Sequence, residues 1–231
     1  MLPTRIFPLG ENAVTVEFGS EISEPLNDAA MNLAEYFDAN RFPGFVEAVP
    51  AIASLTIFYK LHEVRQNLPE NKTAFEFVKN AVEKAATGLA DKPRVNSRVV
   101  EIPVSFREED ALDLQFIAES REVSTDEVIK IFLSKLYRVY MLGFLPGFPY
   151  MGIVDERIAV PRKPSPRLIV PKGSVGIAGQ QTGIYPRESP GGWQIIGRTE
   201  IELITPDETS PCYFHPGDTV RFVNTRSEPP A

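Results

Sequence analysis

Residues 168–196 of the chain have the sequence LIVPKGSVGIAGQQTGIYPRESPGGWQII, in which short apolar runs alternate with glycine and proline turns. Short β-type runs bounded by such turns indicate strands. The pattern extends in both directions, and the predicted strands are Arg138–Leu142, Leu168–Val170, Val175–Ala178, Gln194–Ile196, Ile201–Ile204 and Thr219–Val223. Many short strands are typical of a barrel or a sandwich, because closure removes exposed strand edges. We therefore predict a compact β-barrel as the C-terminal domain, residues 96–231.

The first 95 residues have a different pattern, in which strands alternate with amphipathic helices. One helix opens at Ser23 and continues to Phe37, and a second follows a cap at Asn71 and ends at Gly88. The predicted strands are Arg5–Leu9, Ala13–Phe18, Phe45–Val49, Leu55–Tyr59 and Val99–Val104. The order ββαββαβ contains the βαββαβ of a ferredoxin-like split βαβ fold. The predicted fold class is α+β, with a ferredoxin-like N-terminal domain at residues 1–95.

Local signals in the sequence indicate where the domain boundary lies and where the next helices begin. The charged, proline-bearing sequence DKPR at residues 91–94 is typical of a break between domains, and the boundary lies there or just after the strand Val99–Val104. Two helical stretches are predicted between Asp110 and Leu136. Ser124 opens the second of them, and Glu127 three residues later matches a capping box.

The composition excludes several classes of function. The 231 residues are 43% hydrophobic, carry a formal net charge of -7 and include one cysteine, Cys212. A single cysteine permits no internal disulfide, and the sequence MLPTRIFPLG at the start lacks the apolar segment of a signal peptide. The most apolar run, Val46–Tyr59, is interrupted by polar residues and is shorter than a bilayer span. We therefore expect a cytoplasmic protein that binds neither membranes nor, given its negative charge, nucleic acid.

Signatures of a self-sufficient catalytic centre are absent from the sequence. It contains no GxxxxGK[ST] phosphate loop, no HExxH zinc motif and no GxSxG nucleophile elbow. Its histidines, His62 and His215, are far apart from each other and from Cys212, so no metal site built from such ligands is expected. The sequence assigns no catalytic residue.

One candidate surface is the segment GFLPGFPY at residues 143–150, where two glycines and two prolines bend a backbone that carries three aromatic side chains. Rigid turns can hold such rings toward a partner. Phe144, Pro146 and Phe148 are the candidate partner-binding residues, together with Trp193, the only tryptophan. The alternative is a buried corner of the barrel, because phenylalanine is more often a core residue.

A second candidate is the basic, proline-rich segment PRKPSPR at residues 161–167. Proline restricts the backbone and so reduces the entropy lost on binding. The planar guanidinium group of arginine suits a carboxylate or a phosphate. We expect Arg162, Lys163 and Arg167 to bind an anionic group, and the alternative is a solvated basic loop.

A third candidate is the glycine-rich segment GSVGIAGQQTG at residues 173–183. Glycines let backbone amides approach a ligand closely, although they also serve ordinary turns and bulges. The remaining members of the predicted substrate- or anion-binding set are Gly173, Ser174, Gln180, Gln181, Tyr185 and Arg198. We expect the loops between residues 143 and 198 to converge into one concave face with cations at its edge.

Four segments together resemble a known family, the 5-oxoprolinase B subunit, also described as allophanate hydrolase subunit 1, which includes the sporulation kinase inhibitor KipI. In chain order from Tyr137 to Phe222 they are YRVYMLGFLPGFPYMG, PRKPSPRLIVPKGSVGIAGQQTGIYP, SPGGWQIIGRT and PGDTVRF. The resemblance implies a cyclophilin-like barrel in the C-terminal domain. It also implies assembly with a homologous C subunit, assembly with the A subunit, and ATP-dependent cleavage of 5-oxoproline to glutamate.

The chain departs from the family pattern at two places. Ser105 and Phe106 stand where the resemblance implies cysteine and tyrosine, and Phe132 stands where it implies histidine. A proton-transfer role for that histidine therefore cannot apply here. Ser105 would be a poor nucleophile without a base, and the sequence indicates none nearby.

Two functions remain open at this point. In the first, the chain is a non-autonomous subunit of an ATP-dependent lactam hydrolase, with ATP bound by this chain or by a partner, and its cations hold phosphate or carboxylate charge. In the second, it is a KipI-like regulator that binds and inhibits a histidine kinase, with Phe144, Phe148 and Trp193 as anchors.

Overall fold

The computed structural model describes residues 1–66, 68–69, 71–89, 98–205 and 211–225. The chain divides into two compact units, Met1–Asn96 and Ser97–Ala231. The predicted break at residues 91–94 lies outside the described residues. Among the described residues, no helix combines the length and the apolar character needed to cross a bilayer. Both units combine helices with sheets, which confirms the prediction of a mixed α+β protein.

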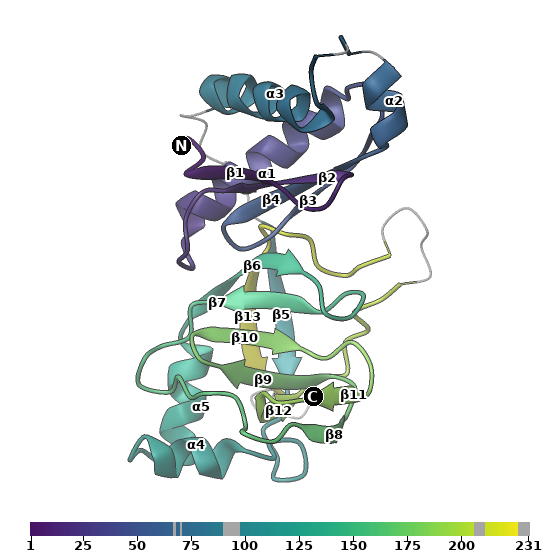
Figure 1. Ribbon diagram of the computed structural model, residues 1–231. Coiled ribbons are helices and arrows are strands. Elements are labelled where there is room, and N and C mark those ends of the chain that lie inside the picture. Colours follow the sequence, from purple (N-terminus) through teal and green to yellow (C-terminus); the bar gives the residue numbers. More distant parts are fainter. Residues whose placement is uncertain (67, 70, 90–97, 206–210, 226–231) are drawn as a thin grey trace. The chain divides into compact units, whose positions relative to one another are not determined.

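The first unit contains a four-stranded antiparallel sheet in the order β1-β2-β4-β3 (Figure 1). Its strands are β1 (Arg5–Pro8), β2 (Ala13–Glu17), β3 (Phe45–Pro50) and β4 (Ser54–Tyr59). Alternate residues of the central strands are buried, because successive side chains of a strand point to opposite faces. One face of the sheet therefore forms the core of this unit.

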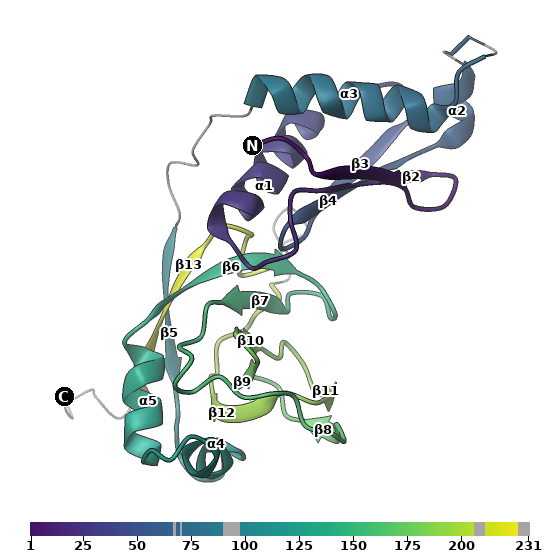
Figure 2. The same ribbon diagram turned by 60° about the vertical axis from the view of Figure 1, so that its left-hand side comes forward.

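Two long helices cover that face, as Figures 1 and 2 show. The helices of this unit are α1 (Glu24–Ala39), α2 (Leu61–Gln66) and α3 (Ala74–Leu89). Leu33 and Phe37 of α1 share a buried cluster with Val78 and Val82 of α3. Both long helices were predicted, whereas α2 was not. The cap of α3 is Thr73 rather than Asn71: the Thr73 hydroxyl accepts a hydrogen bond from the Glu76 amide at 3.1 Å, and a Glu76 carboxylate oxygen accepts one from the Thr73 amide at 2.9 Å.

The strand at residues 99–104 lies in the C-terminal domain, as the predicted boundary has it, but its predicted role as the last strand of the ferredoxin-like sheet is wrong. This strand, β5 (Val99–Val104), pairs in parallel with β13 (Thr219–Asn224) in the sheet of the second unit. In the first unit, β1 occupies the edge position beside β2, where the last strand of a ferredoxin-like sheet would pair. The sequence order was therefore identified correctly, but the partner of β5 lies about 120 residues later in the chain, beyond the reach of a local pattern.

The second unit is built on a seven-stranded sheet in the order β12-β9-β10-β7-β6-β13-β5 (Figure 1). The strands not yet given are β6 (Leu136–Leu142), β7 (Pro149–Gly152), β9 (Ser174–Ala178), β10 (Gln181–Ile184) and β12 (Gln194–Arg198). The two edges of this sheet meet at an isolated bridge, in which the Ser105 amide donates to the Arg198 carbonyl at 2.8 Å and the Arg198 amide to the Ser105 carbonyl at 2.9 Å. The sheet thus curls on itself around a large apolar core.

The remaining elements of this unit lie outside the curled sheet (Figure 2). They are the helices α4 (Leu114–Ser120) and α5 (Thr125–Leu133) and a two-stranded ribbon of β8 (Arg167–Val170) and β11 (Ser189–Gly191). The Ser124 hydroxyl accepts a hydrogen bond from the Glu127 amide at 3.1 Å, which confirms the predicted cap of α5. The predicted strand Ile201–Ile204 does not form, and Ile204 makes only an isolated bridge to Cys212.

Two of the three residues that sequence analysis singled out as departures, Phe106 and Phe132, lie in the core of this unit, whereas Ser105 is half-buried. The Phe132 ring is fully buried and lies 5.0 Å from the Tyr137 ring and 4.8 Å from the Phe222 ring, between centroids. Phe106 is 6.5 Å from Phe132, so the two departures contact the same aromatic cluster. Position 132 therefore packs the core, and its side chain cannot transfer a proton.

Candidate functional site

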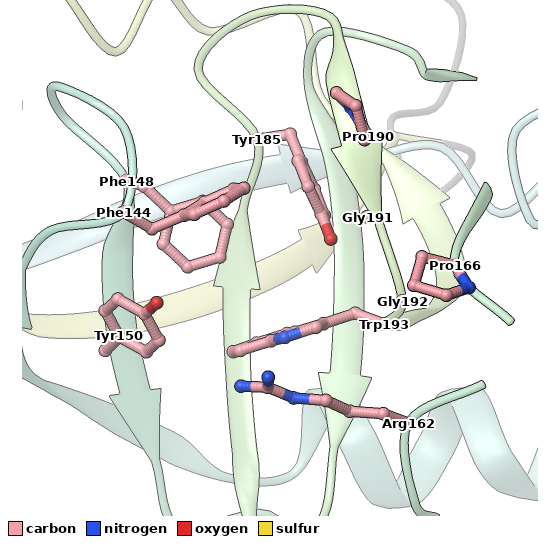
Figure 3. Close-up of a pocket in the computed structure, with 10 residues that line it drawn as sticks. All are labelled: Phe144, Phe148, Tyr150, Arg162, Pro166, Tyr185, Pro190, Gly191, Gly192 and Trp193. Carbon is pink, nitrogen blue, oxygen red and sulfur yellow. The ribbon is translucent and has the colours of Figure 1, made fainter. Parts of the chain in front are cut away.

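A pocket of about 270 Å³ opens on the second unit, and we call it the aromatic pocket. Its lining residues come from four separate segments of the chain (Figure 3): Phe144, Phe148, Tyr150, Arg162, Pro166, Tyr185, Pro190, Gly191, Gly192 and Trp193. Of the residues predicted from sequence, the structure thus brings Phe144, Phe148, Arg162, Tyr185 and Trp193 together in one place.

Three buried rings form the base of the aromatic pocket. Phe148, Tyr185 and Trp193 are each at most 5% exposed. The Phe148 ring meets the Trp193 ring edge to face at 5.4 Å and the Tyr185 ring at 5.3 Å, the separations at which aromatic rings attract each other. Phe148 packs against both other rings and all three are buried in one cluster, so the base is preformed.

Phe144 forms the outer wall of the pocket. Its backbone has a φ of 64°, an uncommon value for a residue with a side chain, and its ring is 59% exposed. The ring still packs edge to face on Phe148 at 5.5 Å. The turn is closed by a hydrogen bond from the Gly143 amide to the Phe148 carbonyl at 3.1 Å. Pro146 lies in this turn, is exposed and does not line the pocket.

Glycine is required where the backbone approaches these rings. A Cβ at Gly191 would overlap the Tyr185 hydroxyl group, and a Cβ at Gly183 would lie 2.8 Å from the Phe148 ring. Both positions therefore tolerate only a hydrogen as side chain unless the rings move. The glycines nearest the pocket maintain its shape through close packing.

Arg162 is the cation of the aromatic pocket. Its guanidinium carbon lies 5.8 Å from the centre of the Trp193 ring, within the range of a cation–π contact (Figure 3). Within the part of the chain that the structure describes, no carboxylate forms an ion pair with it. Burial raises the pKa of the Tyr150 and Tyr185 hydroxyl groups. The positive charge of Arg162 lowers both pKa values, but by less, so both hydroxyl groups remain protonated at neutral pH. The pocket thus offers one cation, two hydroxyl groups and apolar ring surfaces.

Lys163 and Arg167, predicted as anion ligands, bind a carboxylate of the chain itself. The buried Asp113 accepts two hydrogen bonds from Arg167, at 2.7 and 2.6 Å, and one from Lys163 at 3.2 Å. Its Oδ2 also accepts a hydrogen bond from the Ile195 amide at 2.7 Å. One carboxylate therefore binds both cations, and of the three predicted anion ligands Arg162 alone lines the aromatic pocket, so the expectation that all three face one ligand site is wrong.

The glycine-rich segment forms the hairpin of β9 and β10, and its backbone amides are largely used within the sheet. The Gly173 amide donates to the Tyr185 carbonyl at 2.8 Å, and the Gly179 amide to the Val160 carbonyl at 2.7 Å. Ser174 is buried at the start of β9, Gln180 is exposed in the turn and Gln181 is half-buried at the start of β10. These residues do not line the aromatic pocket, so the expected cradle of backbone donors is not formed there.

Arg198 lies in a second hollow of about 580 Å³, which we call the seam hollow because it lies where the two sheet edges meet. Its lining residues are Pro103, Ser105, Arg107, Arg198, Glu200, Ile201 and Thr225. The Arg198 Nε donates to the Lys172 carbonyl at 2.9 Å. The predicted set is thus divided between two hollows, and the expectation of a single concave face is wrong in this respect.

Ser105 has an acidic neighbour that sequence reasoning missed. Its hydroxyl donates to Asp110 Oδ2 at 2.6 Å. The same oxygen accepts hydrogen bonds from Arg107 Nε at 3.2 Å and Arg107 Nη2 at 3.0 Å. Because this oxygen already has three donors, the arrangement stabilises the loop after β5 and does not provide a general base.

Three residues of the aromatic pocket region were also missed: Tyr150, Pro166 and Asp113. Tyr150 and Pro166 were quoted within candidate segments but were not singled out. Asp113 directly precedes α4, where an aspartate ordinarily caps the helix, so nothing local distinguishes it. Among the described residues, no cluster of three or more histidine, cysteine, aspartate or glutamate side chains could hold a metal ion.

Comparison with known proteins gives consistent results. Residues 4–214 match the family described as carboxyltransferase domain, subdomain C and D. The chain is 47% identical to the 5-oxoprolinase B subunit of Bacillus subtilis (strain 168) over 95% of its own length and 92% of that protein. It is 35% identical to the 5-oxoprolinase B subunit of Escherichia coli O157:H7 over 96% of its own length and 97% of that protein.

A solved structure has the same fold over nearly the whole chain. The crystal structure of TTHA0988 superposes with a TM-score of 0.76 at 36% sequence identity and covers 94% of this chain. The match covers 40% of the TTHA0988 chain, so the present chain spans less than half the length of that neighbour.

Proposed function

The chain belongs to the family of the carboxyltransferase domain, subdomain C and D, and from that premise we propose that it acts as the B subunit of a 5-oxoprolinase-type complex. The similarity to two proteins of that name, each matched over more than nine-tenths of both chains, supports the proposal. The departures at Ser105, Phe106 and Phe132 do not line the aromatic pocket.

We place the lactam substrate in the aromatic pocket, and one observation carries this assignment. A preformed pocket of about 270 Å³ combines ring surfaces with one arginine that has no carboxylate partner among the described residues. 5-Oxoproline is a flat five-membered lactam with one carboxylate. Its ring would lie against the aromatic side chains, and its carboxylate would bind the Arg162 guanidinium group. Pockets for drug-sized ligands are typically about 300–1,000 Å³, so a smaller pocket suits so small a molecule.

The Tyr150 and Tyr185 hydroxyl groups have roles in the same proposal. Both remain protonated near neutral pH, because burial raises the pKa of each. A protonated phenol can donate a hydrogen bond to a lactam oxygen and so stabilise negative charge that develops there. This chain would therefore bind the lactam and polarise its carbonyl group.

The hydrolysis requires ATP in our proposal, but the aromatic pocket does not fit ATP. A triphosphate needs several cations or backbone amides, whereas the pocket offers one arginine, and the sequence has no phosphate loop. We therefore assign ATP binding to a partner. The proposed partners are the homologous C subunit of the 5-oxoprolinase complex together with its A subunit. The additional length of TTHA0988 is consistent with a fused partner region.

The finer fold assignment is part of the same proposal. We assign the curled sheet of the second unit to the cyclophilin-like class, which its strand order and edge closure support. We assign the first unit to the ferredoxin-like class, with β1 in the position that the fourth strand normally occupies.

A second function uses the same pocket as a docking site. Phe144 is 59% exposed on a turn beside the pocket, and an exposed aromatic side chain is a typical anchor of a protein interface. A KipI-like regulator would use it to hold a histidine kinase. This alternative is excluded if the chain, at about 10 μM, does not bind the histidine kinase whose gene lies nearest to its own.

The experiment that tests the leading proposal is copurification with the candidate C and A subunits, followed by an assay of ATP-dependent glutamate release from 5-oxoproline. We expect a stable assembly whose activity requires this chain. The variant Arg162→Ala should assemble normally and lose about tenfold to hundredfold in kcat/KM, as expected for loss of a charged hydrogen bond. Full activity of an assembled Arg162→Ala complex would remove the substrate from this pocket.

A further inference from the structure

The side chain of Asp113 does not perform the role that its position suggests. Asp113 occupies the N-cap position of α4, where aspartate normally accepts a hydrogen bond from the helix backbone. Its side chain makes no such cap. The carboxylate is 4% exposed and instead binds residues from two distant parts of the chain.

Four donors surround this carboxylate. Arg167 binds it as a fork, with Nη1 to Oδ2 at 2.7 Å and Nη2 to Oδ1 at 2.6 Å. Lys163 Nζ donates to Oδ1 at 3.2 Å, and the Ile195 amide donates to Oδ2 at 2.7 Å. The Asp113 amide in turn donates to the Ile195 carbonyl at 2.7 Å, so the residue is fixed on β12 through both backbone and side chain.

These contacts hold both ends of one short loop. Lys163 directly follows Arg162, and Arg167 directly follows Pro166, and it is Arg162 and Pro166 that line the aromatic pocket. The loop is further attached by a hydrogen bond from the Lys163 amide to the Gly192 carbonyl at 2.7 Å. The two pocket-lining residues are therefore presented by neighbours that a single carboxylate binds.

The charges make this arrangement sensitive to Asp113. Lys163 and Arg167 are 29% and 23% exposed, and Asp113 is the acidic residue with which both form ion pairs. Without that negative charge the two cations repel each other and gain by moving into water. Such a movement would carry Arg162 away from Trp193 (Figure 3).

We propose that Asp113 is the positioning residue of the aromatic pocket: its buried carboxylate binds Lys163 and Arg167 and thereby holds Arg162 over Trp193. The inference about loop position stands on the geometry alone. Its consequence for substrate affinity rests on the proposed function, so the two are measured separately.

The position of the loop can be measured without any ligand. Trp193 is the only tryptophan of the chain, is 5% exposed and contacts Arg162, so its fluorescence reports on the loop. In Asp113→Asn we expect a red-shifted emission and about a twofold rise in acrylamide quenching, because displacement of the loop exposes the indole ring. Far-UV circular dichroism should remain that of the native protein.

Asp218→Asn is the matched control. Asp218 is also a buried aspartate in the same unit, binds an arginine fork from Arg98 at 3.3 and 2.7 Å, and accepts the His215 amide at 2.8 Å. It does not line the aromatic pocket. A fluorescence change confined to Asp113→Asn supports the proposal. An unchanged Trp193 signal in Asp113→Asn, or the same change in both variants, overturns it.

If Asp113→Asn fails to fold, Arg167→Lys replaces it. This substitution keeps the charge but loses the fork, and the same fluorescence outcomes then decide. In the assembled complex, Asp113→Asn should raise KM for 5-oxoproline with a smaller effect on kcat. Because Asp113 acts through Arg162, the double variant with Arg162→Ala should have the KM of Arg162→Ala alone. An additive effect on KM contradicts a positioning role. A changed Trp193 signal with an unchanged KM in both single variants supports the positioning role and removes the substrate from the pocket instead.

Discussion

The aromatic pocket and the seam hollow lie in the same unit, and each contains an arginine for which the described residues provide no acidic partner. Their walls differ. The aromatic pocket has buried rings at fixed angles, whereas the seam hollow is lined mainly by exposed or half-buried polar side chains around Ser105. Aromatic side chains line only the first of these two hollows, so a ring-shaped ligand can pack against rings there but not in the second. The comparison teaches that an arginine alone does not identify a site, and that the surfaces beside it decide what can bind.

The two hollows also differ in how their own carboxylates are used. Near the aromatic pocket, Asp113 binds Lys163, which directly follows Arg162, and Arg167 at the other end of the same loop. Beside the seam hollow, Asp110 binds two of its lining residues, Arg107 and Ser105, on the same short loop. The first arrangement transmits an effect to a pocket residue, and the second stabilises a local turn.

The largest expected effect tests whether the glycines of the segment 173–183 serve close packing. Gly173 has a φ of 80°, and a Cβ there would overlap the Thr199 carbonyl oxygen. We expect Gly173→Ala to lower the free energy of unfolding by about 4 kcal/mol, from backbone strain and steric overlap together. Urea unfolding followed by circular dichroism measures it.

Gly179→Ala is the control for this effect. Gly179 has a φ of 60°, but no atom lies within 4 Å of the position of a Cβ. It should cost about 1 kcal/mol, the strain contribution alone. Equal costs at both positions would mean that close packing is not what Gly173 provides.

The next largest effect is the pH dependence of the unfolding free energy, which tests the contacts of Asp113. Burial raises the pKa of the Asp113 carboxyl group, but hydrogen bonds from Arg167 and the Ile195 amide lower it more, so the pKa lies below its ordinary value. A lowered pKa stabilises the folded state above the unfolded pKa of about 3.9, and this stabilisation is lost as the pH falls through the folded pKa. Asp113→Asn should cost about 3 kcal/mol at neutral pH. The difference from wild type, measured by urea unfolding, should shrink below about pH 4.

Gly179→Ala provides the contrast, since it removes no charge and no atom lies within 4 Å of the position of its Cβ. Its stability difference from wild type should not depend on pH in the same acidic range. A difference between wild type and Asp113→Asn that stays constant from about pH 7 to about pH 3 would contradict the ion-pair account.

A smaller effect separates the two arginines. In the assembled complex Arg162→Ala should lower kcat/KM for 5-oxoproline by about tenfold to hundredfold, or about 1.4–2.8 kcal/mol. Arg198→Ala, the equivalent change in the seam hollow, should lower it by less than about twofold, because no aromatic side chain lines that hollow to pack against the lactam ring. Steady-state kinetics on both complexes checks this. The reverse order would move the substrate to the seam hollow.

The smallest effect is expected at Ser105. Ser105→Ala removes one hydrogen bond to Asp110, which keeps its two hydrogen bonds from Arg107. We expect a loss of about 1 kcal/mol in unfolding free energy and no measurable change in kcat. Loss of turnover in this variant would show that Ser105 takes part in the chemistry.

The parts of the fold that the sequence predicts correctly depend on local patterns. The amphipathic spacing of α1, the Ser124 cap of α5 and the apolar runs of β9 and β12 can each be recognised within a few residues. Strands β7 and β10 were missed because glycine and proline in them resemble turn signals, although these residues serve close packing in the sheet.

The candidate site was predicted in part for the same reason. Phe148, Tyr185 and Trp193 could be chosen because they lie in glycine- and proline-rich segments close together in the sequence. Asp113 could not be chosen, since it lies 50 and 54 residues from Lys163 and Arg167. Pairing over such separations depends on the tertiary fold, and the two cations were therefore assigned to a ligand.

The most direct test of the central claim is a crystal structure of the assembled complex soaked with 5-oxoproline in the absence of ATP. We predict density for the ligand in the aromatic pocket, with its ring against Trp193 and Tyr185 and its carboxylate on Arg162. Density in the seam hollow or wholly within a partner protein, with an empty aromatic pocket, would contradict the account.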